Sequence, residues 1–270
     1  MEMDRKIFRM TEQKYDYMNT SIVAFPKTGI AYNDALYSAL EGCGVKVKEG
    51  MFTGRWILKN IGRFDSIHLH WPSFLYATKK GIASELFAFT KFFLFLIYVK
   101  IRCRSLFWTA HNLYPHNPSA TPFLDKIARW AVIAFCSKIF VHGETAAMTL
   151  VREFPRAKYK LKIIKHGNWM DYYPKNISPK EARSRFNIPE DKVVYLFIGL
   201  CSKYKNVDLL VEAFSDVPDN SMLLIAGKFQ DREYHAKVEN LLEKITDKQT
   251  RMDAKFIADD DLQYYLLASD

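Results

Sequence analysis

Imidazole and amide side chains crowd the segment that follows a short apolar run at residues 106–109. The run is β-prone, which predicts a strand buried on both faces. The polar and aromatic residues of the following loop, which is punctuated by prolines, are His111, Asn112, Tyr114, His116 and Asn117. An imidazole can donate or accept a proton near neutral pH, so it suits a position beside reacting groups. Open parallel sheets bind ligands at the carboxyl ends of their strands, and this loop has that position.

The surrounding sequence alternates apolar runs with helical patterns. The predicted strands cover residues 20–25, 45–48, 64–72, 106–109, 137–142 and 161–167. The predicted helices cover residues 32–40, 85–101, 123–135 and 146–154. This alternation predicts βαβ units that build a parallel sheet, and therefore an α/β fold.

Six of the seven histidines fall at or just after the ends of predicted strands. They are His68, His70, His111, His116, His142 and His166, whereas His235 lies on a predicted helix. Carboxyl ends of parallel strands meet at one edge of a sheet, so we expect these imidazoles to gather in one cleft.

Two patterns could indicate a metal site. His68 and His70 share one strand face at i, i+2, but no third ligand follows at convincing spacing, which favours packed strand-end residues. Residues 259–261 are three consecutive aspartates before an apolar helical pattern, and capping of a helix start with favourable dipole placement is the preferred interpretation. We therefore predict no metal.

The composition restricts the partners. The chain has 39 Lys and Arg against 30 Asp and Glu, a net charge of +9 that favours anionic ligands or an acidic membrane face. No nucleic-acid recognition motif accompanies this charge, so we expect no nucleic acid. The four cysteines are scattered without metal-ligand spacing, and the N-terminal residues lack the apolar core of a signal peptide. We expect reduced thiols in a cytoplasmic protein.

The predicted helix at residues 85–101 is strongly apolar and interrupted by Lys91. It is too short for a comfortable transmembrane span and leads directly into a predicted strand, which favours a helix packed on the sheet. The alternative is an interfacial helix at the membrane, supported by basic flanking residues: Lys79, Lys80, Lys100, Arg102 and Arg104.

The periodicity lapses between Trp169 and Pro189 and then resumes. The second series has predicted strands at 193–199, 221–227 and 254–258, with helices at 207–214 and 232–245. We divide the chain into an N-terminal extension (1–19), a first Rossmann-like domain (20–174), a linker (175–190) and a partial second domain (191–270).

Five motifs together resemble the GT-B glycosyltransferases of the retaining family four type, which include bacterial enzymes of capsule and exopolysaccharide assembly. They occupy residues 68–72, 108–116, 164–168, 197–214 and 224–227. The resemblance spans about residues 20–270. It implies two Rossmann-like domains facing a cleft and transfer of a sugar from a UDP- or GDP-linked nucleotide sugar, without a metal or other cofactor. It also implies a lipid-linked glycan or other saccharide as acceptor, and peripheral attachment at the inner face of the plasma membrane.

The resemblance assigns residues by motif position. Catalytic contacts fall on His111 and Asn112. Donor-binding positions are Gly199, Lys203, Lys205, His142, Glu144 and His166. Acceptor-binding positions are His70, Trp71, Tyr114 and His116. The sequence departs from the pattern at Ser202, where relatives carry Arg, and at Asn206, where they carry Gly.

Relatives also carry a Glu-x7-Glu segment beyond the position at which this chain ends, so the resemblance implies that the second domain is truncated. One alternative is a non-catalytic acceptor-binding or membrane-docking subunit without a complete donor site. A GT-B epimerase acting on a nucleotide sugar is a further alternative with the same fold.

Overall fold

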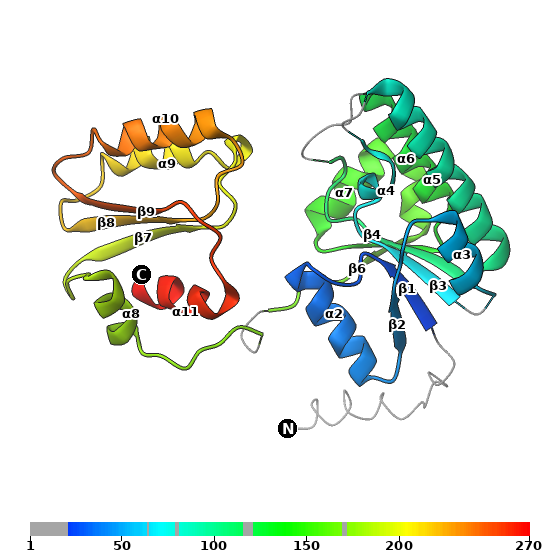
Figure 1. The fold of residues 1–270 in the computed structure, drawn as a ribbon, viewed down its shortest axis with the longest axis horizontal. Coiled ribbons are helices and arrows are strands. Elements are labelled where there is room, and N and C mark those ends of the chain that lie inside the picture. Colours follow the sequence, from blue (N-terminus) through cyan, green and yellow to red (C-terminus); the bar gives the residue numbers. More distant parts are fainter. Residues whose placement is uncertain (1–20, 64, 79–80, 116–120, 169–171) are drawn as a thin grey trace. The chain divides into compact units, whose positions relative to one another are not determined.

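The computed structural model describes residues 21–63, 65–78, 81–115, 121–168 and 172–270. The chain forms two compact units, Met1–Gly167 and Asn168–Asp270. Each unit is a parallel sheet with helices on both faces (Figure 1).

The first unit contains six parallel strands in the order β2-β1-β3-β4-β5-β6. They are β1 (Ser21–Phe25), β2 (Lys46–Glu49), β3 (Asp65–Leu69), β4 (Ser105–Thr109), β5 (Lys138–Val141) and β6 (Leu161–Ile163). The connecting elements are α2 (Ala31–Gly42), α3 (Gly54–Asn60), α4 (Ser73–Tyr76), α5 (Ile82–Arg102), α6 (Pro122–Phe135), α7 (Glu144–Glu153) and the 3₁₀ turn η2 (Pro155–Tyr159). The six predicted strands are confirmed, and the short helices α3 and α4 are additions.

Strand alternation decides what each face of this sheet carries. Ile67 and Leu69 point into the large apolar core under α5 and α6. The next residues along the chain, His68 and His70, therefore point to the opposite face, where they meet Tyr37 of α2. The alternation of side chains along β3 therefore places the histidines on the face covered by α2 and the apolar residues on the opposite face.

The long helix α5 has a buried side and an exposed side. One side, with Phe92, Leu96 and Val99, is buried against the sheet. The other side exposes large apolar side chains: Ile82, Leu86, Phe87, Leu94 and Ile101. Among the described residues, α5 is the one helix long and apolar enough to cross a membrane, a test that core helices also pass.

The second unit has three parallel strands in the order β7-β8-β9. They are β7 (Val193–Ile198), β8 (Ser221–Ala226) and β9 (Gln249–Asp253). Its helices are α8 (Pro179–Phe186), η3 (Lys203–Lys205), α9 (Val207–Phe214), α10 (Arg232–Leu242) and α11 (Asp259–Ala268). One core packs α9 and α10 on the sheet, and a second packs α8 and α11 on its other face.

The segment expected as a linker contains a helix, and one predicted strand lies at another position. The segment expected as a linker, 175–190, contains α8, which begins with a capping box at Ser178 and packs Ala182 and Phe186 into the second core. The last strand lies at Gln249–Asp253 instead of 254–258. Because β9 pairs only with β8, it is an edge strand and can carry exposed polar residues that an apolar pattern does not reveal.

Candidate functional site

A cluster of aromatic rings covers the carboxyl edge of the first sheet. Tyr32, in the first turn of α2, lies with its ring centroid 4.7 Å from that of His111, 5.0 Å from His166 and 5.2 Å from His142. The His111 ring stacks on Trp71 at 4.3 Å with an interplanar angle of 11°. The loops after β3, β4, β5 and β6 thus meet around one phenol ring, as the histidine positions predicted.

A chain of hydrogen bonds runs beneath this cluster. Thr109 Oγ1 lies 2.8 Å from His68 Nε2, and the Tyr37 hydroxyl lies 2.9 Å from His68 Nδ1 and 2.6 Å from His70 Nε2. His70 Nδ1 then meets His111 Nε2 at 3.0 Å. Because each neutral imidazole has one donor and one acceptor, the chain can be satisfied in either direction. In one direction Nδ1 of His111 is a donor toward a ligand, and in the other it is an acceptor.

Burial keeps the inner imidazoles neutral. Desolvation lowers the pKa of His68 to about 3, with a contribution from His111, and it also lowers the pKa of His70. Desolvation lowers the pKa of His111 to about 4, with contributions from His142 and His166. At neutral pH these rings bind through hydrogen bonds and carry no charge.

His142 offers an acceptor to the same region. Its Nδ1 lies 3.0 Å from the carbonyl oxygen of Ile164, and a carbonyl can only accept, so Nδ1 carries the proton. The remaining nitrogen, Nε2, is buried and has no hydrogen-bond partner within the described parts of the chain. A ligand hydroxyl could donate to it.

The other predicted residues of the first unit are distributed differently. His111 and Asn112 line a cavity of about 300 Å³ between the ends of β4 and β5 and helix α7. Tyr114 lies away from the histidines, because its hydroxyl donates to Glu153 at 3.0 Å. Glu144 is exposed at the start of α7. His116 lies outside the described residues.

In the second unit, the loops after β7 and β8 touch. Gly199 and Gly227 have φ angles of 132° and 157°, and a Cβ on Gly227 would overlap the carbonyl oxygen of Gly199. The Lys205 amine lies over Gly199, 3.4 Å from the position that a Cβ would take there. Glycine at these positions therefore lets two loops and one ammonium group come together.

Helix α9 begins directly after this loop. Asn206, at a position where the resemblance leads us to expect Gly, precedes it in the left-handed conformation, with φ 52° and ψ 43°, which Asn tolerates. Ser202, at the family's Arg position, is buried, and its hydroxyl has no partner among the residues described. Lys203 is paired with Asp231 at 3.1 Å. The Lys205 amine is thus the cationic group that this loop places beside the start of α9, while the backbone N–H groups of Cys201, Lys205 and Asn206 already donate to carbonyl oxygens.

Neither pattern considered for metal binding gathers a ligand set. No group of three or more His, Cys, Asp and Glu side chains in the described segments could hold an ion. Asp259, Asp260 and Asp261 form the first turn of α11, where the helix dipole favours them, and Ala258 is the N-cap.

The sequence interpretation missed Tyr32 and Tyr37. Both belong to the helix after the first strand, whose first turn must lie at the edge where the histidines gather. That rule gives the position of Tyr32. The contact of Tyr37 with His68 and His70 also requires the face on which the histidines point.

The comparisons with known proteins agree with this architecture. Residues 178–270 match the family described as glycosyl transferases group 1. The structure of HepE from Anabaena in complex with UDP and glucose has a TM-score of 0.62 at 16% identity, with 93% of this chain and 72% of that chain covered. The complex of the same protein with UDP-glucose gives a TM-score of 0.61, with the same identity and coverage.

The catalytic domain of starch synthase IV from Arabidopsis thaliana, bound to ADP and acarbose, has a TM-score of 0.51 at 12% identity, with 80% of this chain and 52% of that chain covered. No curated protein matches the sequence. The chain therefore has the GT-B fold, and its second unit carries the match to glycosyl transferases group 1.

Proposed function

We propose that the chain is a glycosyltransferase that moves a sugar from a UDP- or GDP-linked donor to a lipid-linked or other saccharide acceptor. The observation that carries this proposal is the loop after β7, within the region that matches group 1. There the Lys205 ammonium lies over Gly199 at the start of α9. A nucleoside diphosphate gains negative charge as it leaves, and a cation with backbone N–H groups stabilises that charge.

The first unit supplies the contacts to sugar and acceptor hydroxyls. His111 presents Nδ1 from a buried chain of hydrogen bonds, and His142 presents an unpartnered Nε2. Imidazole rings in these positions suit hydrogen bonding and proton positioning. In line with the family resemblance, we propose a retaining transfer in which the departing diphosphate participates directly, without a protein nucleophile or a metal cofactor.

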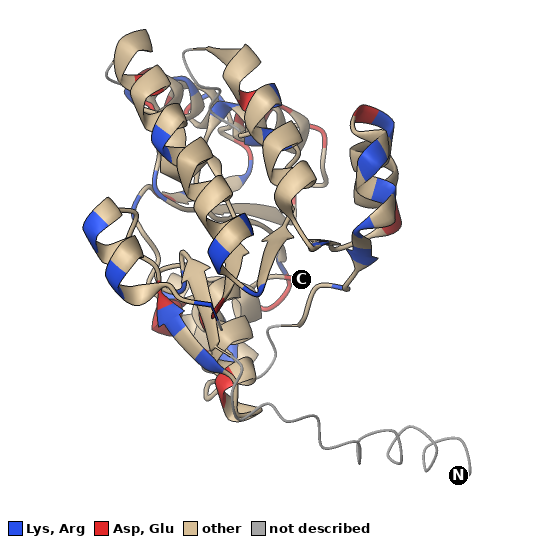
Figure 2. Cartoon of the chain, turned by 90° about the vertical axis from the view of Figure 1, so that its right-hand side faces the viewer, with Lys and Arg blue, Asp and Glu red and all other residues tan. Residues whose placement is uncertain are grey.

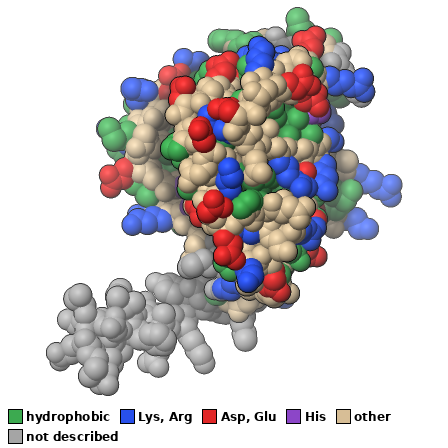
Figure 3. Space-filling model, turned by 90° about the vertical axis from the view of Figure 1, so that its left-hand side faces the viewer, with side chains coloured by type: hydrophobic (Ala, Val, Ile, Leu, Met, Phe, Trp, Pro, Cys, Tyr) green, Lys and Arg blue, Asp and Glu red, His purple; other side chains and the backbone are tan. Residues whose placement is uncertain are grey.

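The acceptor side contacts a membrane in this proposal. The exposed face of α5 is apolar, and its last turn carries Lys100 and Arg102. Charged side chains are sparse along this helix (Figure 2). In contrast, the face of the second unit seen in Figure 3 intersperses basic and acidic side chains. Peripheral attachment at the inner face of the plasma membrane would place the enzyme beside a lipid-linked glycan for capsule or exopolysaccharide synthesis.

One observation favours the alternative, a non-catalytic acceptor-binding subunit. Lys203 is paired with Asp231, and Ser202 stands where relatives carry Arg. Under that alternative, Lys205 alone is too weak a cationic site for the diphosphate.

A thermal-shift screen with UDP, GDP, ADP and their sugars distinguishes the two. A ligand that binds only the folded state raises the melting temperature, so the glycosyltransferase should respond to one base over the others. The absence of any shift at millimolar nucleotide would contradict a working donor site and support the acceptor-binding alternative.

A further inference from the structure

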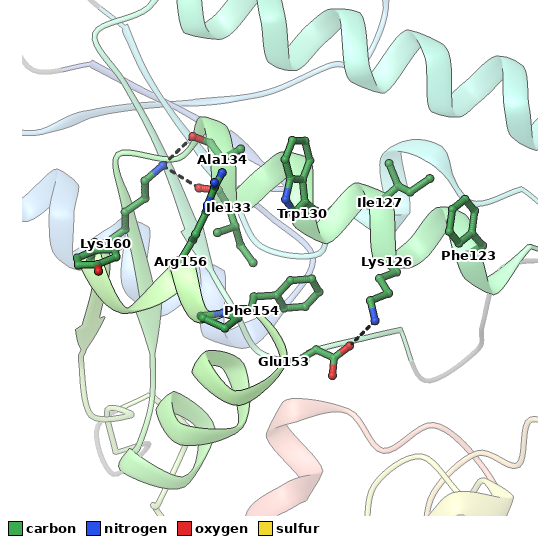
Figure 4. Close-up of a pocket in the computed structure, with 12 residues that line it drawn as sticks. Phe123, Lys126, Ile127, Trp130, Ile133, Ala134, Glu153, Phe154, Arg156 and Lys160 are labelled. Carbon is green, nitrogen blue, oxygen red and sulfur yellow. Dashed lines mark hydrogen bonds and ion pairs between the residues drawn. The ribbon is translucent and has the colours of Figure 1, made fainter.

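An elongated apolar groove lies along helix α6, on the opposite side of the first sheet from α2. Its volume is about 870 Å³. One wall consists of successive α6 side chains from Phe123 through Trp130 to Ala134, and the other is the segment from Glu153 to Lys160 (Figure 4). The eleven steps of 1.5 Å along the helix from Phe123 to Ala134 make the groove about 17 Å long. Its length and narrow, apolar lining fit a single extended hydrocarbon chain.

The groove leaves large apolar side chains in water. Phe123 is 69% exposed and Trp130 is 53% exposed, although both belong to a helix whose other face is fully packed. Helix α5 packs beside α6 and exposes its own apolar side chains (Figure 1). The groove therefore lies along α6, which packs beside the helix that we place at the membrane.

The charges around the groove are unequally distributed. Its lining holds three cations and one carboxylate, and that carboxylate, Glu153, is paired with Lys126 at 3.1 Å near the Phe123 end. At the other end, Lys160 caps α6 by donating to the carbonyl oxygens of Ile133 and Ala134. Arg156 extends toward the same end and makes no hydrogen bond or ion pair with any described residue (Figure 4). This end is cationic and can receive an anion.

We infer that the groove binds one chain of an anionic membrane lipid, with the lipid phosphate held by Arg156 and the chain lying along α6 toward Phe123. The inference deepens the proposed membrane contact, on which it rests. It differs from general membrane partitioning because it requires one lipid in one site. Arginine suits the phosphate because its guanidinium group can donate two parallel hydrogen bonds.

The test uses decyl phosphate below its critical micelle concentration, with the full chain, in isothermal titration calorimetry. We expect saturable binding of one molecule per chain, and no detectable binding of inorganic phosphate. Ala134→Trp fills the groove and should weaken binding at least tenfold. Arg156→Gln should weaken binding of decyl phosphate about tenfold and leave binding of decanol unchanged.

Matched controls are Ala39→Trp and Arg55→Gln, which change exposed residues on α2 and α3, away from the groove. Both should bind decyl phosphate as the unchanged chain does. Binding that is not saturable, or that Ala134→Trp leaves unchanged, would overturn the inference. The nucleotide response is measured on the same variants, so a failed groove with an intact nucleotide shift separates this inference from the proposed transferase activity.

Discussion

The two sheets of this protein end in loops of opposite character. At the carboxyl edge of the first sheet, rings bind one another: Tyr37 joins His68 to His70, and His70 joins His111. At the edge of the second sheet, Gly199 and Gly227 allow close contact between two backbone segments beside the Lys205 amine. The Ser202 hydroxyl there has no hydrogen-bond partner among the described residues.

The difference fits the ligands that the proposed function assigns to each edge. An imidazole acts usefully on a hydroxyl only when its tautomer and ring orientation are fixed, which requires partners on its inner nitrogen. A phosphate needs room and unsatisfied donors, because it brings several acceptor oxygens of its own. The first edge is therefore expected to be sensitive to lost hydrogen bonds and the second to added volume.

Removing the outermost imidazole should give the largest effect. His111→Ala deletes the ring that ends the hydrogen-bond chain and that contacts the reacting groups under the proposed function, so transfer should fall about 100- to 10,000-fold. The loss leaves His70 Nδ1 without its partner, so the melting temperature should fall by a few degrees, whereas the nucleotide-induced shift should be retained. Steady-state kinetics measures the loss, and His235→Ala, on the second unit, is the control. Unchanged turnover would remove His111 from the chemistry.

Adding one methyl group at Gly227 should destabilise the second unit. Gly227→Ala places a Cβ against the backbone oxygen of Gly199, which no side-chain rotation can relieve. We expect a loss of about 3 kcal/mol in the unfolding free energy of the second unit. Gly54→Ala, where a Cβ meets nothing within 4 Å, should change stability by less than about 0.5 kcal/mol. Equal urea midpoints for the two variants would refute the close packing of these loops.

Lowering the pH should destabilise the first unit more than the second. The pKa of His68 is about 3 in the folded unit and 6.5 in its ordinary state, so below pH 6.5 only the unfolded chain gains a proton there. Stability therefore falls as pH falls, by about 2 kcal/mol between pH 6.5 and 5 from His68 alone.

The second unit should keep its stability over that range. Hydrogen bonds from Lys237 hold the pKa of Asp208 below its usual 3.8, so the stability that this carboxylate contributes is lost only at still lower pH. Hydrogen exchange at pH 5 and 6.5, corrected for intrinsic rates, measures both units in one sample. A uniform response of the two units would contradict the buried neutral histidines.

Much of this contrast could be predicted from sequence. The alternation of strand and helix patterns predicted the parallel sheets. The histidines at the strand ends predicted that the functional side chains gather at the carboxyl edge of the first sheet. The hydrogen-bond chain could not be predicted, because it depends on which strand face each histidine occupies and on Tyr37, which comes from a helix distant in sequence. Likewise, the exposed polar strand β9 and the helix α8 are stabilised by their neighbours more than by their own patterns.

The two lysines in the loop after β7, Lys203 and Lys205, provide the finest test of the comparison. Both were predicted to bind the donor, yet Lys203 is paired with Asp231, whereas Lys205 lies over Gly199. Lys205→Ala should weaken binding of the preferred nucleoside diphosphate about tenfold, because it removes the cation beside the start of α9. Lys203→Ala removes an exposed ion pair of little energetic value and should weaken binding less than threefold. Titration calorimetry with both variants decides the assignment. If Lys203→Ala had the larger effect, Lys203 would have to break its ion pair with Asp231 in order to bind the diphosphate. The second edge would then change its side-chain contacts on ligand binding, whereas the hydrogen-bond chain of the first edge is formed without a ligand.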